Sequence, residues 1–342
     1  MNSTNSFYIS GMTEDQNGGI FHCVWRNNAP QIEEFHPLER NLCLAWAPDR
    51  KTLYASSQHD GIGSVAAYSV DPQGKLHHLN TLPASGRSVC FLQASACGRF
   101  LYSANYASGN ISEFTIAPDG SLAALKQTID HSGCSVHPEQ TSPHPHCCIF
   151  TPDEKYLCVA DLGTDKLLLY AFDPEHGISP AAVKAFAVAP GSGPRQLLFD
   201  AQGRFLYTLC ELGNTIHRFS YSNGELHFID AVSTLPPEAK DSSAAALKFS
   251  PDGKLLYASN RGDDSIAVFT VESDGKIFVK AFYSSGGSSP RDFNFLPGKN
   301  IIVAANEFSR EAAFFNCDPA SGVIASAPCG KLTMPRPLYI LL

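Results

Sequence analysis

The chain has 342 residues, of which 44% are hydrophobic and 17% are charged, and its formal net charge is −8. This composition is typical of a well-packed globular protein and excludes a chain that stays disordered for lack of apolar residues. The negative net charge argues against a nucleic-acid partner, because nucleic acids bind to basic surfaces. No apolar run approaches the roughly 18 residues that a membrane-spanning helix needs, so we expect no membrane partner.

The N-terminus and the cysteines indicate a cytoplasmic protein. The N-terminal segment MNSTNSFYISGMTEDQ has no basic region followed by an apolar core, so it does not predict a secretory signal. The 11 cysteines form no C-x-x-C pair, and several lie within apolar runs. We therefore expect buried free thiols in a reducing compartment rather than a disulfide framework.

A unit of about 49 residues recurs along the chain, and repeats of this length indicate a repeat architecture. Its clearest copy, residues 249–269, reads as an apolar run, the turn Pro251-Asp252-Gly253, a second run, another turn and a third run. Proline, aspartate and glycine in this order favour a tight turn. Each copy is anchored on one residue of its second run. The anchors are Tyr8, Tyr54, Tyr102, Cys158, Tyr207, Tyr257 and Val303, at spacings of 46, 48, 56, 49, 50 and 46.

The repeats predict an all-β fold, a seven-bladed β-propeller with four antiparallel strands in each blade. No segment shows sustained helical periodicity, and four strands fit into each repeat at ordinary strand and turn lengths. The first copy lacks its first strand, and residues 334–342 supply one, so the C-terminal strand should join the N-terminal blade and close the ring. We expect one domain over residues 1–342. A solenoid of stacked strands is the alternative, but it would need polar end caps.

The candidate site follows from lining up the copies. The start of the first strand and the end of the second strand lie at the same end of a blade, because a tight turn joins the two strands. These positions should therefore gather around one mouth of the central channel. The strand starts are Leu42, Cys90, His146, Arg195, Ala245 and Arg291. The strand ends are Met12, Gln58, Tyr106, Leu162, Glu211, Arg261 and Glu307.

Copies four to seven place three arginines, two glutamates and a histidine in this set, which suits a small anionic ligand. A histidine among such groups is a natural acid or base near neutral pH. The alternative is that the charges satisfy one another as ion pairs around a water-filled channel.

The longest interval between anchors lies just before His146 and contains four histidines and one cysteine, in residues 131–146. Their spacing fits no standard zinc pattern, and prolines stiffen the segment, so we expect no metal. We expect instead a loop that forms one wall of the site, with His144 as a secondary polar contact. The glycine-rich turns before Arg195 and Arg291 lack the strand-to-helix context of a nucleotide-binding loop.

Several segments of the chain resemble the bacterial lactonase family of seven-bladed propellers. They are SPHPHCCIFTPDEKYLCVADLGTDKL, GSGPRQLLFDAQGRFLYTLCELGNTI, FSPDGKLLYASNRGDDSIAVF and SPRDFNF. The family includes the propeller-type 6-phosphogluconolactonases and is similar to fungal 3-carboxy-cis,cis-muconate lactonizing enzyme. The resemblance implies that His146, Arg195, Glu211 and Arg261 are active-site residues. Gln196 stands where the family usually has a histidine; it can form hydrogen bonds but cannot titrate.

The resemblance implies hydrolysis of a sugar-acid lactone, with 6-phosphogluconolactone as the first expectation and the pentose phosphate pathway as its setting. We expect His146 to activate a water molecule with Glu211, and Arg195 or Arg261 to stabilise the oxyanion. The expected substrate-binding residues are Arg291, His144, Tyr106, Glu307 and Gln196. The reaction requires no cofactor, and the expected partner is a phosphorylated or carboxylated lactone.

Two other functions remain open on the sequence evidence. One is a cycloisomerase that acts on a carboxymuconate-like diacid, with the same arginines binding carboxylates. The other is a non-catalytic propeller that binds a metabolite or a protein, because a fold does not determine a function.

Overall fold

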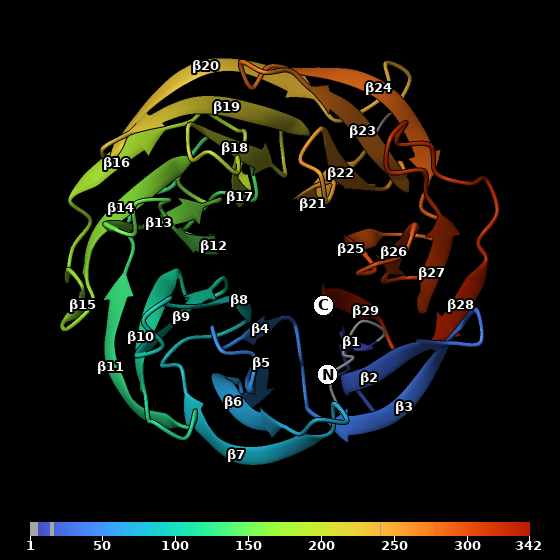
Figure 1. Ribbon diagram of the computed structural model, residues 1–342. Helices are drawn as coiled ribbons and strands as arrows, with labels where there is room; N and C mark the ends of the chain where they lie inside the picture. Colours follow the sequence, from blue (N-terminus) through green and yellow to red (C-terminus); the bar gives the residue numbers. More distant parts are fainter. Residues whose placement is uncertain (1–5, 14–16, 240) are drawn as a thin grey trace. The chain divides into compact units, whose positions relative to one another are not determined.

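The computed structural model describes residues 6–13, 17–239 and 241–342 (Figure 1). Over these residues every regular element is a β-strand, and none of them forms a helix long and apolar enough to cross a membrane. The strands form seven antiparallel sheets, one for each sequence repeat. The sheets fall into two compact units, residues 1–40, 214–216 and 231–342 in the first and residues 41–213 and 217–230 in the second.

The first unit contains three four-stranded sheets. In hydrogen-bonded order, one sheet is β29 (Pro337–Leu341), β1 (Ser6–Gly11), β2 (Gly19–Arg26) and β3 (Ala29–Pro37). The next is β21 (Ser243–Phe249), β22 (Leu255–Arg261), β23 (Ser265–Val271) and β24 (Ile277–Ser284). The third is β25 (Pro290–Phe295), β26 (Ile301–Asn306), β27 (Glu311–Asn316) and β28 (Gly330–Thr333).

The second unit contains the other four sheets, apart from a few residues of β19 and β20. The first two are β4 (Leu44–Trp46), β5 (Thr52–His59), β6 (Ile62–Val70) and β7 (Leu76–Pro83), and β8 (Val89–Ala94), β9 (Phe100–Asn105), β10 (Asn110–Ile116) and β11 (Leu122–Asp130). The third is β12 (Pro145–Phe150), β13 (Tyr156–Asp161) and β14 (Lys166–Asp173), with β15 (Gly177–Ile178) and β16 (Lys184–Ala187) both paired to β14. The fourth is β17 (Pro194–Phe199), β18 (Phe205–Cys210), β19 (Thr215–Ser222) and β20 (Glu225–Ser233).

The C-terminal strand joins the N-terminal sheet, as the sequence predicts. Strand β29 pairs antiparallel with β1, and Ile340 lies opposite Ile9. The pairing gives hydrogen-bond partners to a strand edge that would otherwise be open, which is why a chain can complete its first sheet with its last residues. The split of the fourth strand into β15 and β16 was not predicted. Pro180 lies between the two pieces and has no N–H to donate to β14.

The turns between the first and second strands have the predicted chemistry. In the clearest repeat, Asp252 Oδ1 accepts hydrogen bonds from Lys254 N at 3.2 Å and from Ser250 Oγ at 2.7 Å, and Gly253 has a φ of 72°. Arg50 and Glu154, at equivalent turns, adopt the same left-handed conformation with φ of 57° and 52°. The Asp side chain therefore determines the turn even where the glycine is missing.

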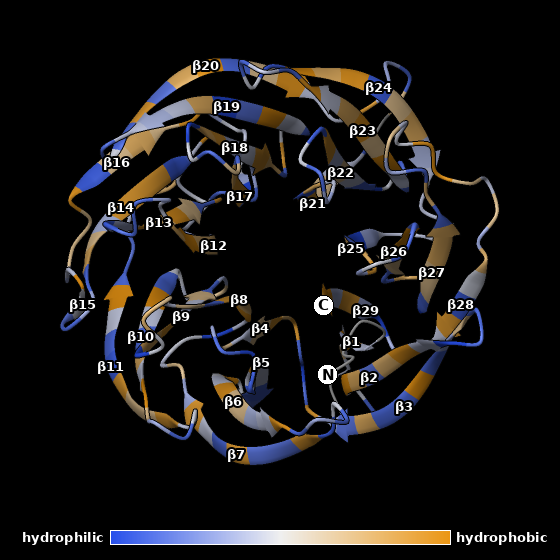
Figure 2. Ribbon diagram, viewed as in Figure 1, coloured by the Kyte–Doolittle hydropathy of each residue, from blue (hydrophilic) through white to orange (hydrophobic). Residues whose placement is uncertain are grey.

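The seven anchor residues all lie in the second strand of their sheets and are buried, with the four repeated tyrosines fully inaccessible. Four of them pack in apolar clusters that join adjacent sheets; Tyr257, for example, lies in a cluster with Phe293 and Phe315. The fourth strands are more exposed; in Figure 2 blue segments lie along β3 and β7, whereas β24 is largely orange. All eleven cysteines are free thiols in the structure, and eight of them are buried.

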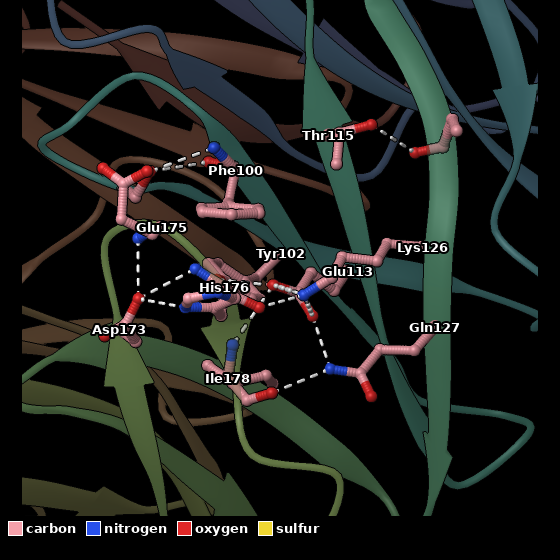
Figure 3. A network of polar contacts seen from close by, with 12 residues as sticks. Phe100, Tyr102, Glu113, Thr115, Lys126, Gln127, Asp173, Glu175, His176 and Ile178 are labelled. Atoms are coloured by element: carbon pink, nitrogen blue, oxygen red, sulfur yellow. Dashed lines mark hydrogen bonds and ion pairs between the residues drawn. The ribbon is translucent and has the colours of Figure 1, made fainter.

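A buried glutamate links the sheet β8–β11 to strand β15 of the next sheet (Figure 3). The Glu113 side chain is fully inaccessible and accepts hydrogen bonds from Tyr102 Oη at 3.1 Å and from Ile178 N at 3.2 Å. Gln127 Nε2 also donates to it, and Lys126 Nζ lies 3.4 Å from both carboxylate oxygens. Each donor reaches a buried negative charge, so the network contributes more than neutral hydrogen bonds would.

We predict that Glu113→Ala lowers the free energy of unfolding by about 2–4 kcal/mol, because it leaves the buried Tyr102 Oη and Ile178 N without their acceptor. Urea denaturation measures this change. Glu175→Ala is the control, because it removes only a surface ion pair between Glu175, whose side chain is 64% exposed, and Arg99, whose side chain is 47% exposed. The urea midpoint of this variant should stay unchanged. Equal losses in the two variants would contradict the prediction.

The buried tyrosines predict that the fold loses stability in base. Burial raises the pKa of Tyr54, Tyr102, Tyr207 and Tyr257 well above the ordinary value of 10, and it raises that of Tyr68 to about 12. Because the folded-state pKa is the higher one, the stabilisation is complete below about pH 10 and is lost as pH rises through the folded-state pKa values. Urea denaturation between about pH 9 and 12 should show a steady fall in the free energy of unfolding; a constant value would contradict this.

Candidate active site

The predicted strand-start positions coincide with β-bulges. In four sheets the second residue of the first strand is an extra residue without a partner on the second strand. In β17, Pro194 pairs with Cys210 and Gln196 pairs with Leu209, which leaves Arg195 as the bulged residue. A bulge bends the strand and re-aims the side chain that it carries. The four bulged residues are Cys90, His146, Arg195 and Arg291.

Arg195 joins His146 and Glu211 through one nitrogen atom. Its Nη1 donates to Glu211 Oε2 at 2.7 Å and lies in close contact with His146 Nε2. The side chains of Arg195 and Glu211 are only 7% and 13% exposed, so solvent screens this ion pair little. A guanidinium can only donate, so His146 Nε2 accepts and its ring is neutral in this arrangement. The lone pair that a general base needs is therefore on Nε2.

Tyr106 and His144 form a wall beside this group. Their rings are stacked with centroids 4.3 Å apart, and Tyr106 lies edge-on to His146 at 5.6 Å. His144 Nδ1 donates to the Tyr106 carbonyl oxygen at 2.9 Å, and its Nε2 lies 3.4 Å from Ser142 Oγ. Burial raises the pKa of Tyr106 to about 12, helped by Glu211 and opposed by Arg195. The Tyr106 hydroxyl is therefore protonated at neutral pH and can donate a hydrogen bond.

The loop that precedes His146 is held by a buried aspartate that the sequence analysis missed. Asp161 Oδ1 accepts from the backbone N–H groups of His144, Gly163 and Thr164 at 2.8, 3.0 and 3.2 Å. Its Oδ2 lies 2.7 Å from His131 Nδ1 at the other end of the loop. The residue is fully buried. Asp161 is the last residue of strand β13. A charged residue at the end of this apolar run is the sequence signal that could have identified it.

The first unit holds a second charged group. Glu307, which is 4% exposed, lies 3.7 Å from Arg291 Nη1 and accepts from Arg336, whose Nε is 3.2 Å from Oε1 and whose Nη2 is closer. The sequence analysis missed Arg336. It follows a proline, as Arg195 and Arg291 do. However, the extra residue of β29 is Leu338, two residues after Arg336, whereas Arg195 and Arg291 are themselves the extra residues of their strands. Arg336 therefore does not occupy the position that the repeat alignment compares.

The structure brings together five of the predicted site residues within the second unit, and it pairs Arg291 with Glu307 in the first. Those five are Tyr106, His144, His146, Arg195 and Glu211. Arg261 ends strand β22 in the first unit, where its carbonyl oxygen accepts from Ser242 Oγ at 2.8 Å. Gln196 is half-buried in β17 opposite Leu209. Across the described ranges, no group of three or more His, Cys, Asp or Glu side chains is arranged to hold a metal ion.

The seven sheets, with His146 and Arg195 at bulges and Glu211 directly after β18, are typical of a β-propeller hydrolase. The family profile described as "Lactonase, 7-bladed beta-propeller" matches residues 6–341, almost the whole chain. The chain therefore belongs to the lactonase family of seven-bladed β-propellers and is a lactone hydrolase. Family membership confirms the predicted fold class.

Two relatives that are named as lactonases support the same assignment, and a third solved structure has a similar fold. The chain is 34% identical to the 6-phosphogluconolactonase of Bacillus subtilis over 293 residues, which cover 84% of this chain and 83% of the relative. It is also similar to the crystal structure of a periplasmic gluconolactonase from Pseudomonas aeruginosa, with a TM-score of 0.92, 29% identity and 98% of each chain covered. A Lactobacillus plantarum protein matches with a TM-score of 0.91, 29% identity and the same coverage.

Proposed function

We propose that the chain hydrolyses 6-phosphogluconolactone to 6-phosphogluconate, with His146, Arg195, Glu211 and Tyr106 around the reacting carbonyl. The observation that carries the proposal is the position of Arg195 Nη1 between Glu211 Oε2 and His146 Nε2. The buried guanidinium supplies a cation for a developing oxyanion, and the neutral imidazole beside it supplies a base for water. The name of the Bacillus subtilis relative supports the choice of substrate. A cytoplasmic location and a role in the pentose phosphate pathway remain predictions.

His146 acts as the base. In the free enzyme its Nε2 accepts from Arg195. As negative charge develops on the lactone carbonyl oxygen, that oxygen becomes the stronger acceptor for the guanidinium, and Nε2 becomes free to take a proton from water. The water oxygen then bonds to the carbonyl carbon. Glu211 holds the guanidinium in place during this change, since its carboxylate is the other partner of the same nitrogen.

Collapse of the tetrahedral intermediate completes the reaction. The bond between the carbonyl carbon and the ring oxygen breaks, and protonated His146 returns its proton to that oxygen, which becomes a hydroxyl group. The new carboxylic acid ionises in water. Water and lactone are the only reactants, so the scheme consumes no cofactor. The Tyr106 hydroxyl, protonated at neutral pH, donates to an oxygen of the substrate.

We predict that Arg195→Ala and His146→Ala each lower kcat for 6-phosphogluconolactone by about 10²–10³, the cost of losing one oxyanion donor or a general base. The assay couples freshly generated lactone to detection of 6-phosphogluconate and subtracts spontaneous ring opening. Circular dichroism is the control that tests whether the variants are folded. An unchanged kcat in either variant would remove the role assigned to that residue, and no turnover by the wild type would reject the substrate.

We also propose that Arg291, expected from the sequence to bind the phosphate or carboxylate of the substrate, binds the phosphate group. Arg291→Ala should then raise KM for 6-phosphogluconolactone by about 10- to 100-fold, the loss of a charge-assisted contact, and leave KM for unphosphorylated gluconolactone nearly unchanged. Arg99→Ala, which removes an exposed arginine on another sheet, is the matched control. Equal effects of Arg291→Ala on the two lactones would contradict phosphate binding at this residue.

A further inference from the structure

We propose that Asp165 is a positioning residue for the active site. Its buried carboxylate holds the backbone at Gly193, and this one residue determines where both Arg195 and Glu211 lie. The inference rests on the function proposed above, because it assigns Asp165 a kinetic effect through Arg195. All four residues lie in the second unit.

The Asp165 carboxylate has three donors and is almost completely buried. The residue is 4% exposed. Its Oδ1 accepts from Gly193 N at 2.7 Å, and its Oδ2 accepts from Gly191 N at 2.7 Å and from Ser135 Oγ at 2.5 Å. These short contacts to an ionised group are stronger and more directional than neutral hydrogen bonds. Asp165 thus ties the loop before β17 and the long loop before β12 to its own turn.

Gly193 connects this carboxylate to the reacting groups. Its N–H donates to Asp165, and its carbonyl oxygen accepts from Glu211 N at 2.7 Å. Pro194 follows with a restricted φ, and Arg195 is next, two residues or at most about 7 Å of chain from Gly193. Gly193 has a φ of 64°, and an added Cβ would lie 2.7 Å from Leu212 Cγ, so the turn has little freedom to compensate for a lost bond.

A second sheet pair repeats the arrangement. Asp264 occupies the equivalent turn in the first unit, with a φ of 55° against 52° for Asp165. Its Oδ1 accepts from Ser289 N at 2.7 Å, and the Ser289 carbonyl oxygen accepts from Glu307 N at 2.9 Å. Ser289 stands two residues before Arg291, as Gly193 stands two residues before Arg195. The same backbone device therefore precedes both bulged arginines.

The intervening sheet has an amide at this turn and no arginine to deliver. Asn214 has a φ of 48°, and its Nδ2 donates to the Ser242 carbonyl oxygen at 2.7 Å. The strand that follows this turn's sheet, β21, carries Ala245 where its register against β22 shifts, between Ala244 and Leu247. An amide has one acceptor oxygen, so it cannot accept from two backbone N–H groups on separate oxygens as Asp165 does. An aspartate therefore occupies this turn in the two cases where the first strand of the next sheet carries an arginine that pairs with a glutamate.

A double-mutant cycle on kcat tests the inference. Asp165→Asn, which keeps the size and one acceptor, should lower kcat by about 10-fold or more, since small displacements of a catalytic group cost this much. If Asp165 acts through Arg195, it should have no further effect in the Arg195→Ala background. Glu113→Gln is the matched control, a buried acid-to-amide change in the same unit, and should keep kcat within about 2-fold at comparable loss of thermal stability.

The outcomes separate the inference from the proposed function. Turnover that Arg195→Ala lowers by about 10²–10³ supports the function, and in that case additive effects of Asp165→Asn and Arg195→Ala would overturn the inference alone. A wild-type kcat in Asp165→Asn would also overturn it. Asp165→Glu keeps the charge but displaces the oxygens by one methylene group, so it should lower kcat as well. If Asp165→Asn does not fold, an unchanged kcat in Asp165→Glu would count against positioning.

Crystal structures of the wild type and Asp165→Asn provide a readout that does not depend on the substrate. We expect the variant to displace the Arg195 guanidinium from Glu211 Oε2, which lies 2.7 Å from Nη1 in the unmodified chain. This displacement would support positioning even if the chain fails to hydrolyse the proposed lactone. An unchanged contact together with unchanged backbone at Gly193 would overturn the inference.

Discussion

An extra residue in the first strand of a sheet cannot pair with the second strand, so its side chain leaves the regular alternation of the strand. In this protein that extra residue is His146 in one sheet, Arg195 in the next and Arg291 in a third. The rest of each first strand continues in register, so the bulge changes the direction of one functional side chain without disturbing the packing behind it. The candidate chemistry depends on this repeated local irregularity.

Buried carboxylates hold the segments that precede two of these bulges. Asp161 binds the backbone before His146, and Asp165 binds the backbone before Arg195. Glu113 does the same between two neighbouring sheets farther from the site. Burying a charge is costly unless donors satisfy it, and most donors to Asp161 and Asp165 are backbone N–H groups of loops. The cost is offset only when each loop adopts one conformation, so these acids favour a rigid site.

The site also depends on the protonation states of its groups. Arg195 remains a cation, His146 accepts at Nε2, and Tyr106, whose pKa burial raises from 10 to about 12, is protonated at neutral pH. A cation, a base and a neutral donor therefore lie together without titrating against one another. This combination suits attack of water on a lactone carbonyl, the reaction class of the family.

The sequence alone determined the repeat number, the all-β class, the turns between strands, the closing strand and the positions of His146, Arg195 and Arg291. These features follow from turn chemistry and apolar periodicity, which act between residues close in the chain. Only the tertiary structure decided that Arg195 bonds both His146 and Glu211, that Asp161 and Asp165 hold their loops, and that Arg336 reaches Glu307. Those contacts join residues from different strands and loops, and a bulge that shifts the register by a residue or two is enough to change which side chains meet.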